Sequence, residues 1–139
     1  MAVIEHLLDA GPLVAFIDRR DRDHEWSKKT LTGISPPLIT CEAVLSETLF
    51  LLRADPAAPQ KVATLFERGL LASRPLLDME AGCVLALMQT YRARPMSLAD
   101  ACLVRLVEKY PGAVVVTLDF DFKIYRRHRR HPIPVLSPR

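Results

Sequence analysis

The sequence predicts a single α/β domain with a mainly parallel β-sheet. Its 139 residues fit one compact domain and leave little room for a second. Short apolar runs that are typical of buried strands alternate along the chain with longer segments of helical periodicity. This alternation is the pattern of βαβ units, in which helices cover a parallel sheet. No internal repeat, low-complexity segment or linker interrupts it, so residues 1–139 are predicted to form one domain.

Five apolar runs are predicted to form the strands. The clearest is the run before Asp119, which follows the turn Pro111-Gly112. The last run is flanked by prolines, which lack the N–H that a central strand needs, so we expect it at an edge of the sheet. The predicted strands are Val3–Leu8, Leu38–Thr40, Leu70–Pro75, Ala113–Leu118 and Ile133–Leu136.

Helices are predicted between these strands. Pro12 and Pro59 are placed to open helices, while Gly33 and Gly69 are placed to end them. Asp78 is a candidate N-cap. The predicted helices are Pro12–Ile17, Trp26–Leu31, a helix from Thr40 or Cys41 to about Arg53, Pro59–Gly69, Asp78–Arg92 and Ser97–Tyr110.

The composition is that of an ordinary water-soluble domain, with 50% hydrophobic and 25% charged residues. No apolar run approaches the ~20 residues that span a bilayer, and no signal peptide is evident, so we expect a cytoplasmic protein that does not associate with membranes. The cysteines Cys41, Cys83 and Cys102 are far apart and form no C-x-x-C pair. They are therefore expected to be reduced and buried, without a zinc site.

Acidic side chains directly follow two of the predicted strands. Asp9 follows the first strand and Asp119 follows the run Ala113–Leu118. Ligands of parallel α/β sheets bind outside the carboxyl ends of the strands, so both acids are placed for function. The alternative for each is an aspartate that caps the next helix or turn.

Two further acids lie on predicted helices. Glu47 shares a helix face with apolar residues, where a carboxylate is costly without a partner. The alternative is that Glu47 points to water. Asp100 lies three residues after Ser97, a spacing that a capping box also explains.

These acids lie in four segments that resemble the motifs of PIN domains. Residues 7–18 (LLDAGPLVAFID) resemble the start of the family, and residues 40–49 (TCEAVLSETL) resemble its second acidic motif, with Glu47 as the functional acid. Residues 96–101 (MSLADA) and 115–122 (VVTLDFDF) resemble the third and fourth motifs, with Asp100 and Asp119. The order and spacing match over essentially the whole chain.

The resemblance implies a five-stranded parallel sheet flanked by helices and a nuclease that depends on Mg²⁺ or Mn²⁺. It implies catalytic roles for Asp9, Glu47, Asp100 and Asp119, with Thr117 in support. Asp121 lies two residues from Asp119 and is a further supporting candidate, which either shares or replaces the role of Asp119. The single-domain form with Tyr-Arg-Arg-His after the fourth motif is similar to VapC toxins. In that group the enzyme usually forms a homodimer and is silenced by a cognate antitoxin.

Carboxylate oxygens are the ligands that Mg²⁺ prefers. We therefore expect Asp9, Asp100 and Asp119 to bind the metal directly or through water. Glu47 is expected to orient or deprotonate the attacking water, or to bind a metal through water. The expected substrate is RNA, as a single strand or a loop whose bases are exposed. Residues 119–139 hold two acids and six bases, and the expected phosphate contacts are Lys123, Arg126, Arg127, Arg129 and Arg130.

Other interpretations remain open from the sequence. The basic run is alternatively a solvated tail, and Tyr125 is either a base-stacking or a packed side chain. A phosphoacceptor signalling domain fits less well because Asp119, and no lysine, follows the late strand. For a phosphatase of the haloacid dehalogenase type, Asp119-Phe120-Asp121 lies too near the C-terminus. A PIN nuclease of RNA processing without a toxin role, or a non-catalytic PIN-like scaffold, is the remaining alternative.

Overall fold

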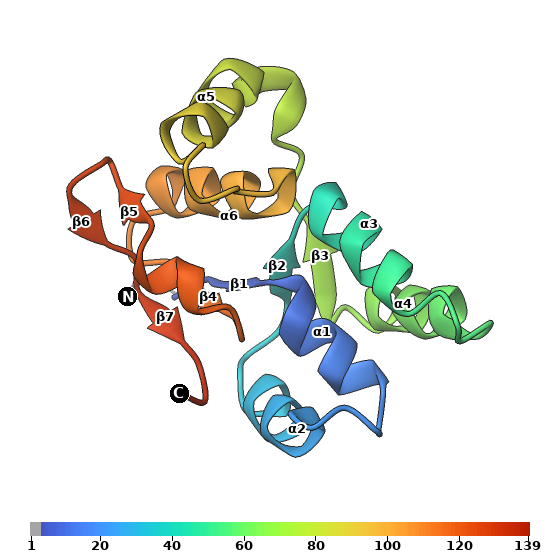
Figure 1. Ribbon diagram of the computed structural model, residues 1–139. Helices are drawn as coiled ribbons and strands as arrows, with labels where there is room; N and C mark the ends of the chain where they lie inside the picture. Colours follow the sequence, from blue (N-terminus) through green and yellow to red (C-terminus); the bar gives the residue numbers. More distant parts are fainter. Residues whose placement is uncertain (1–3) are drawn as a thin grey trace.

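The computed structural model describes residues 4–139 and contains a five-stranded, fully parallel sheet (Figure 1). Its strand order is β3-β2-β1-β4-β7, so β1 lies at the centre between β2 and β4. This confirms the α/β class and the five-stranded sheet. The strands are β1 (His6–Leu8), β2 (Leu38–Thr40), β3 (Leu71–Ser73), β4 (Val114–Val116) and β7 (Val135–Leu136).

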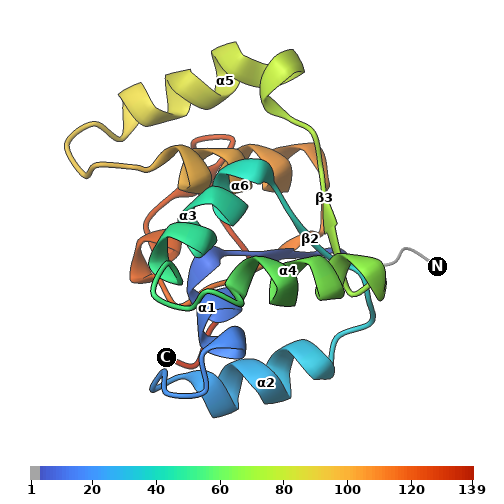
Figure 2. The same ribbon diagram turned by 90° about the vertical axis from the view of Figure 1, so that its right-hand side faces the viewer.

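Helices cover both faces of this sheet. The helices are α1 (Ala10–Ile17), α2 (His24–Thr32), α3 (Glu42–Leu51), α4 (Ala58–Glu67), α5 (Leu77–Thr90) and α6 (Leu98–Lys109), with a 3₁₀ helix η1 (Phe120–Lys123). Figure 2 shows α5 and α6 on one side of the sheet and α2 on the other. Among residues 4–139, no helix is both long enough and apolar enough to cross a membrane.

The two faces have separate hydrophobic clusters. Leu7 of β1 joins the cluster that α3, α5 and α6 cover, whereas its neighbour Leu8 joins the cluster beneath α1 and α2. Successive side chains of a strand point to opposite faces, so β1 is buried on both sides. The core thereby fixes β1, and with it the residue that follows β1.

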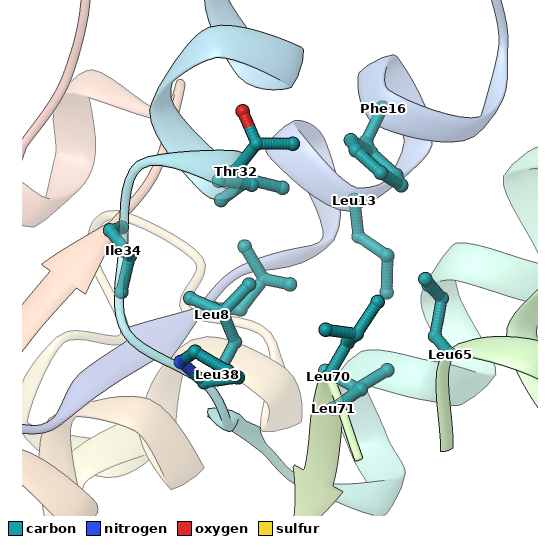
Figure 3. Close-up of a pocket in the computed structure, with 11 residues that line it drawn as sticks. Leu8, Leu13, Phe16, Thr32, Ile34, Leu38, Leu65, Leu70 and Leu71 are labelled. Carbon is teal, nitrogen blue, oxygen red and sulfur yellow. The ribbon is translucent and has the colours of Figure 1, made fainter. Parts of the chain in front are cut away.

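The α1–α2 side of the sheet also contains an apolar pocket of about 210 Å³ (Figure 3). Figure 3 shows side chains from α1, α4 and the strands around this space, among them Leu13, Leu65 and Leu70. Its lining is almost wholly leucine, isoleucine, phenylalanine and proline. An apolar side chain of another molecule would fit there better than a charged ligand.

Several local features differ from the expectation. The chain after η1 forms an antiparallel hairpin of β5 (Arg126–Arg127) and β6 (His131–Pro132), which was not predicted. In the turn of this hairpin, His128 and Arg129 have positive φ angles of 50° and 65°. Residues other than glycine seldom adopt this conformation, so the sequence gives no indication of the turn.

The bounds of several helices and strands also differ from the predicted bounds. The helix α5 begins at Leu77, so Asp78 lies in its first turn rather than at the N-cap. The strands β1, β3, β4 and β7 are shorter than predicted, whereas β2 has the predicted bounds; Val3 of the first predicted strand lies outside the described residues. The three cysteines are free as expected, but only Cys41 and Cys102 are buried; the expectation that Cys83 is buried was wrong, because it lies on an exposed face of α5.

The packing of α6 on the sheet leads to a first prediction. Leu103 has an exposed fraction of 0%, whereas Leu98 on the same helix is 36% exposed. Leu103→Ala is expected to lower the free energy of unfolding by about 2–5 kcal/mol, because it leaves a cavity in a packed core. The same truncation at Leu98 should cost about 1 kcal/mol or less. Urea denaturation of both variants measures the two effects, and equal losses would contradict this account of the core.

Candidate active site

Carboxylates from four segments of the chain surround one pocket at the C-terminal end of the sheet. Asp9 directly follows β1, and Asp119 follows β4, whose residue Val116 is paired with Leu8. Because β1 and β4 are parallel neighbours, their two ends lie at the same edge. Glu47 comes from α3 and Asp100 from the first turn of α6. All four line a pocket of about 430 Å³, together with Asp121.

Asp9 is the most buried of these acids, with an exposed fraction of 5%. Its Oδ1 accepts a hydrogen bond from the backbone N–H of Ala10 at 2.8 Å. Asp9 therefore caps α1, which was the alternative interpretation of this residue from the sequence. Its Oδ2 accepts from the hydroxyl of Thr117 at 2.7 Å. Asp9 therefore both caps α1 and lines the pocket.

Asp100 is also buried, with an exposed fraction of 8%. The hydroxyl of Ser97 accepts the backbone N–H of Asp100 at 3.0 Å, which is the cap expected from the Ser-x-x-Asp spacing. The Asp100 side chain is not used in that cap. Instead its Oδ2 accepts a hydrogen bond from the Tyr125 hydroxyl at 3.0 Å.

The other three acids of the pocket are more accessible. Glu47 is half-buried and lines the pocket, so it does not simply point to bulk water. Asp119 is exposed; it caps η1 by accepting the N–H of Asp121 at 2.9 Å, and its own N–H donates to the Thr117 hydroxyl at 2.9 Å. Asp121 pairs with Arg94, whose Nη1 lies 2.9 Å from Oδ1 of Asp121.

Burial and the charges of neighbouring acids raise the pKa values of Asp9 and Asp100. Burial raises the pKa of Asp9 to about 7, and the charges of Asp100 and Asp119 add to the rise against the opposing hydrogen bond from Thr117. Burial likewise raises the pKa of Asp100 to about 6, with contributions from the charges of Asp119 and Glu47. Near neutral pH the pocket therefore retains protons that a bound cation would displace.

The donors of the pocket fit a hard divalent cation. Five carboxylates and no Lys or Arg line it, and Mg²⁺ and Mn²⁺ prefer oxygen ligands. Within residues 4–139, however, no group of three or more His, Cys, Asp or Glu side chains could hold a metal ion as it stands. The carboxylates surround the pocket without converging on one point, so a cation would have to draw them together.

The predicted phosphate contacts are spread away from this pocket. Arg126 bonds the backbone carbonyls of Lys123, Ile124 and Tyr125, and Arg127 is partly buried. Arg129 and Arg130 are exposed in the β5–β6 turn, beside His128, whose N–H donates to Glu108 near the end of α6. Glu108 lies two turns along α6 from Asp100, about 12 Å at the helical rise.

The sequence analysis missed two residues of this region. Tyr125 was an open choice between base stacking and packing, and its exposed fraction of 0% decides for packing. Arg94 is not among the candidates of the sequence analysis, yet it is bonded to an acid of the pocket. Asp100, the partner of Tyr125, lies 25 positions away in the chain, and Asp121, the partner of Arg94, lies 27 positions away. No local sequence pattern indicates such contacts.

Comparison with known proteins was made by family, by curated sequence and by structure. The PIN domain family model matches residues 6–127. A search of curated proteins gave no match. Among solved structures, the chain is similar to the crystal structure of Mycobacterium tuberculosis VapC20, described as a toxin that cleaves the sarcin–ricin loop.

The likeness to VapC20 has a TM-score of 0.72 at 20% identity and covers 86% of this chain and 94% of that one. At this identity it establishes the fold and not the substrate. The family model spans all the strands and helices that carry the four acids. The chain therefore belongs to the PIN domain family, which is a family of nucleases.

Proposed function

We propose that this protein is a Mg²⁺- or Mn²⁺-dependent endoribonuclease and the toxin of a toxin–antitoxin pair. The observation that carries the proposal is the gathering of Asp9, Glu47, Asp100 and Asp119 around one pocket from four separate segments. Membership of the PIN domain family supports hydrolysis of a phosphodiester. RNA as substrate is supported by the description of VapC20 as a toxin that cleaves the sarcin–ricin loop.

Each acid has a role that follows from its surroundings. Asp9, Asp100 and Asp119 would hold the cation, and Thr117 would keep the Asp9 carboxylate in place through its 2.7 Å hydrogen bond. A divalent cation would supply charge stabilisation and an acidified water. Glu47, half-buried at the pocket wall, would orient that water and accept its proton. Asp121 would support the site by holding Arg94.

Substrate binding requires positive charge near a pocket whose charged lining residues are all acids. Lys123, Arg129 and Arg130 are exposed and would contact phosphates further along the RNA, and Arg126 and Arg127 form β5 of the hairpin whose turn carries Arg129 and Arg130. To these we add Arg94, which is exposed and joined to the pocket by its ion pair with Asp121. Exposed ion pairs are weak, so Arg94 is able to exchange Asp121 for a phosphate at little cost.

Two protein partners are part of the proposal. The helix α5 is rich in apolar residues but buries only Val84 fully, while Leu77, Met79 and Leu85 are 41%, 89% and 54% exposed. Exposed apolar side chains of this kind are suited to contact with a second copy of the chain, which would make a homodimer. The apolar pocket of Figure 3 is suited to apolar side chains of an antitoxin.

The first test of the enzyme is cleavage of a mixed RNA pool with Mg²⁺ or Mn²⁺ against EDTA. Cleavage is expected only with metal, and Asp9→Asn and Asp100→Asn should each reduce it to background because each removes a charged ligand. Asp78→Asn, on the exposed first turn of α5, is the matched control and should cleave normally. Metal-independent cleavage, or full activity of Asp9→Asn, would overturn the proposed site.

The raised pKa of Asp9 leads to a prediction about stability without metal. A group whose pKa is about 7 when folded and 3.8 when unfolded binds more protons in the folded state between these values. Its contribution to the free energy of unfolding is therefore present below pH 4 and is lost as the pH rises to about 7. In EDTA, Asp9→Asn should thus gain Tm relative to wild type between pH 5 and pH 8.

The same melting experiment tests the metal. Excess Mg²⁺ at pH 8 should raise the Tm of wild type, because it binds the folded state, and should have little effect on Asp9→Asn. The comparison with the variant removes the contributions of other titrating groups. A Tm difference between wild type and Asp9→Asn that does not change with pH would show that the pKa of Asp9 is not raised.

Arg94 is tested by the salt dependence of binding to a single-stranded RNA in EDTA. Each phosphate contact to a single strand contributes about 0.7 to the slope of log K against log salt concentration, so Arg94→Ala should reduce that slope by about 0.7. Arg92→Ala is the control, since Arg92 is exposed in the same segment but bonds only the carbonyl of Gln89. Equal slopes for Arg94→Ala and wild type would remove Arg94 from the RNA path.

A further inference from the structure

Tyr125 directs its hydroxyl at an acid of the pocket from within the core. Its side chain is fully buried, and the hydroxyl donates to Oδ2 of Asp100 at 3.0 Å. A buried tyrosine hydroxyl needs a hydrogen-bond partner, and a backbone carbonyl would serve as well. Here the partner is one of the four acids on which the proposed function rests.

The ring of Tyr125 is held in place by two other aromatic side chains. Tyr91 and Phe122 pack edge-on against it, with ring centroids at 5.0 Å and 5.3 Å. Tyr91 contacts Tyr125 through its ring, whereas its hydroxyl bonds elsewhere and accepts the backbone N–H of Arg126 at 2.9 Å. The hydroxyl of Tyr125 therefore occupies a defined position relative to α6, on which Asp100 lies.

This hydrogen bond determines which oxygen of Asp100 is left for a ligand. Oδ2 is engaged by Tyr125, and the Ser97 cap uses only the backbone N–H of Asp100. Within residues 4–139, no hydrogen bond reaches Oδ1 of Asp100, although the residue lines the pocket. Asp9 differs in this respect, because both of its carboxylate oxygens accept hydrogen bonds, from Ala10 and from Thr117.

We propose that Tyr125 is a positioning residue for Asp100: its hydroxyl fixes the carboxylate so that Oδ1 is presented to a divalent cation in the pocket. The inference rests on the proposed function, since it assumes that Asp100 binds metal. Residues that hydrogen-bond a metal ligand typically account for a 10–100-fold difference in metal affinity. Tyr125 would thus act on the site without touching the RNA.

The test measures the dissociation constant of Mn²⁺ by electron paramagnetic resonance at fixed pH, for wild type, Tyr125→Phe and Tyr91→Phe. Both variants remove one hydrogen-bonded hydroxyl from the same aromatic cluster, but only the first removes the bond to Asp100. Tyr125→Phe is expected to bind Mn²⁺ about tenfold more weakly than wild type. Tyr91→Phe is expected to bind it as wild type does, even where its Tm falls.

Two further measurements separate positioning from general damage to the core. Excess Mn²⁺ should restore the cleavage rate of Tyr125→Phe, because the defect is one of affinity. In an Asp100→Ala background, Tyr125→Phe should have no further effect on Mn²⁺ binding, since the carboxylate that accepts the hydrogen bond is absent.

The outcomes distinguish this inference from the proposed function. Wild type that binds Mn²⁺ and cleaves RNA, together with Tyr125→Phe of unchanged affinity, overturns the inference alone. Equal losses in Tyr125→Phe and Tyr91→Phe also overturn it, because the cluster rather than the hydroxyl would then matter. Wild type that neither binds Mn²⁺ nor cleaves RNA overturns the proposed function and the inference together.

Discussion

The buried carboxylate of Asp9 at the end of the central strand is the constraint around which the site is arranged. A buried charge is costly unless hydrogen bonds and nearby charges compensate it. Two hydrogen bonds contribute to that compensation: the N–H of Ala10 donates to Oδ1 of Asp9, and the hydroxyl of Thr117, which follows β4, donates to Oδ2. The same hydroxyl accepts the N–H of Asp119. One threonine therefore connects the two acids that follow β1 and β4, and only a parallel pairing of these strands brings them together.

Much of this arrangement was predictable because its causes are local. The apolar runs and the order of strands and helices indicate a parallel sheet, and this places Asp9 and Asp119 at one edge. The capping pattern of Ser97 and Asp100 was likewise readable from the sequence. Tyr125 and Arg94 were not predictable, because their meaning depends on partners from distant segments. The hairpin of β5 and β6 depends on two residues with positive φ, which the sequence marks with neither glycine nor asparagine.

The local interpretation of each aspartate as a helix cap does not compete with a function. Asp9 caps α1, Asp119 caps η1 and Asp100 lies in the first turn of α6. The N-terminal end of a helix favours negative charge, so these positions lower the cost of gathering acids. For Asp100 the backbone cap and the side-chain hydrogen bond are separate, and this leaves one oxygen available. Helix starts are thus the part of the fold that can carry a cluster of carboxylates with least strain.

The distribution of charge implies that metal and RNA assist one another. Five carboxylates and no basic residue line the pocket, so a phosphate that enters it alone would meet only repulsion. The exposed bases of the hairpin lie near the far end of α6, and Arg94 is paired with an acid. A cation among the acids would remove that repulsion, and a phosphate would in turn add ligands that the dispersed carboxylates do not supply. Because such coupling is reciprocal, each would strengthen the binding of the other by the same factor.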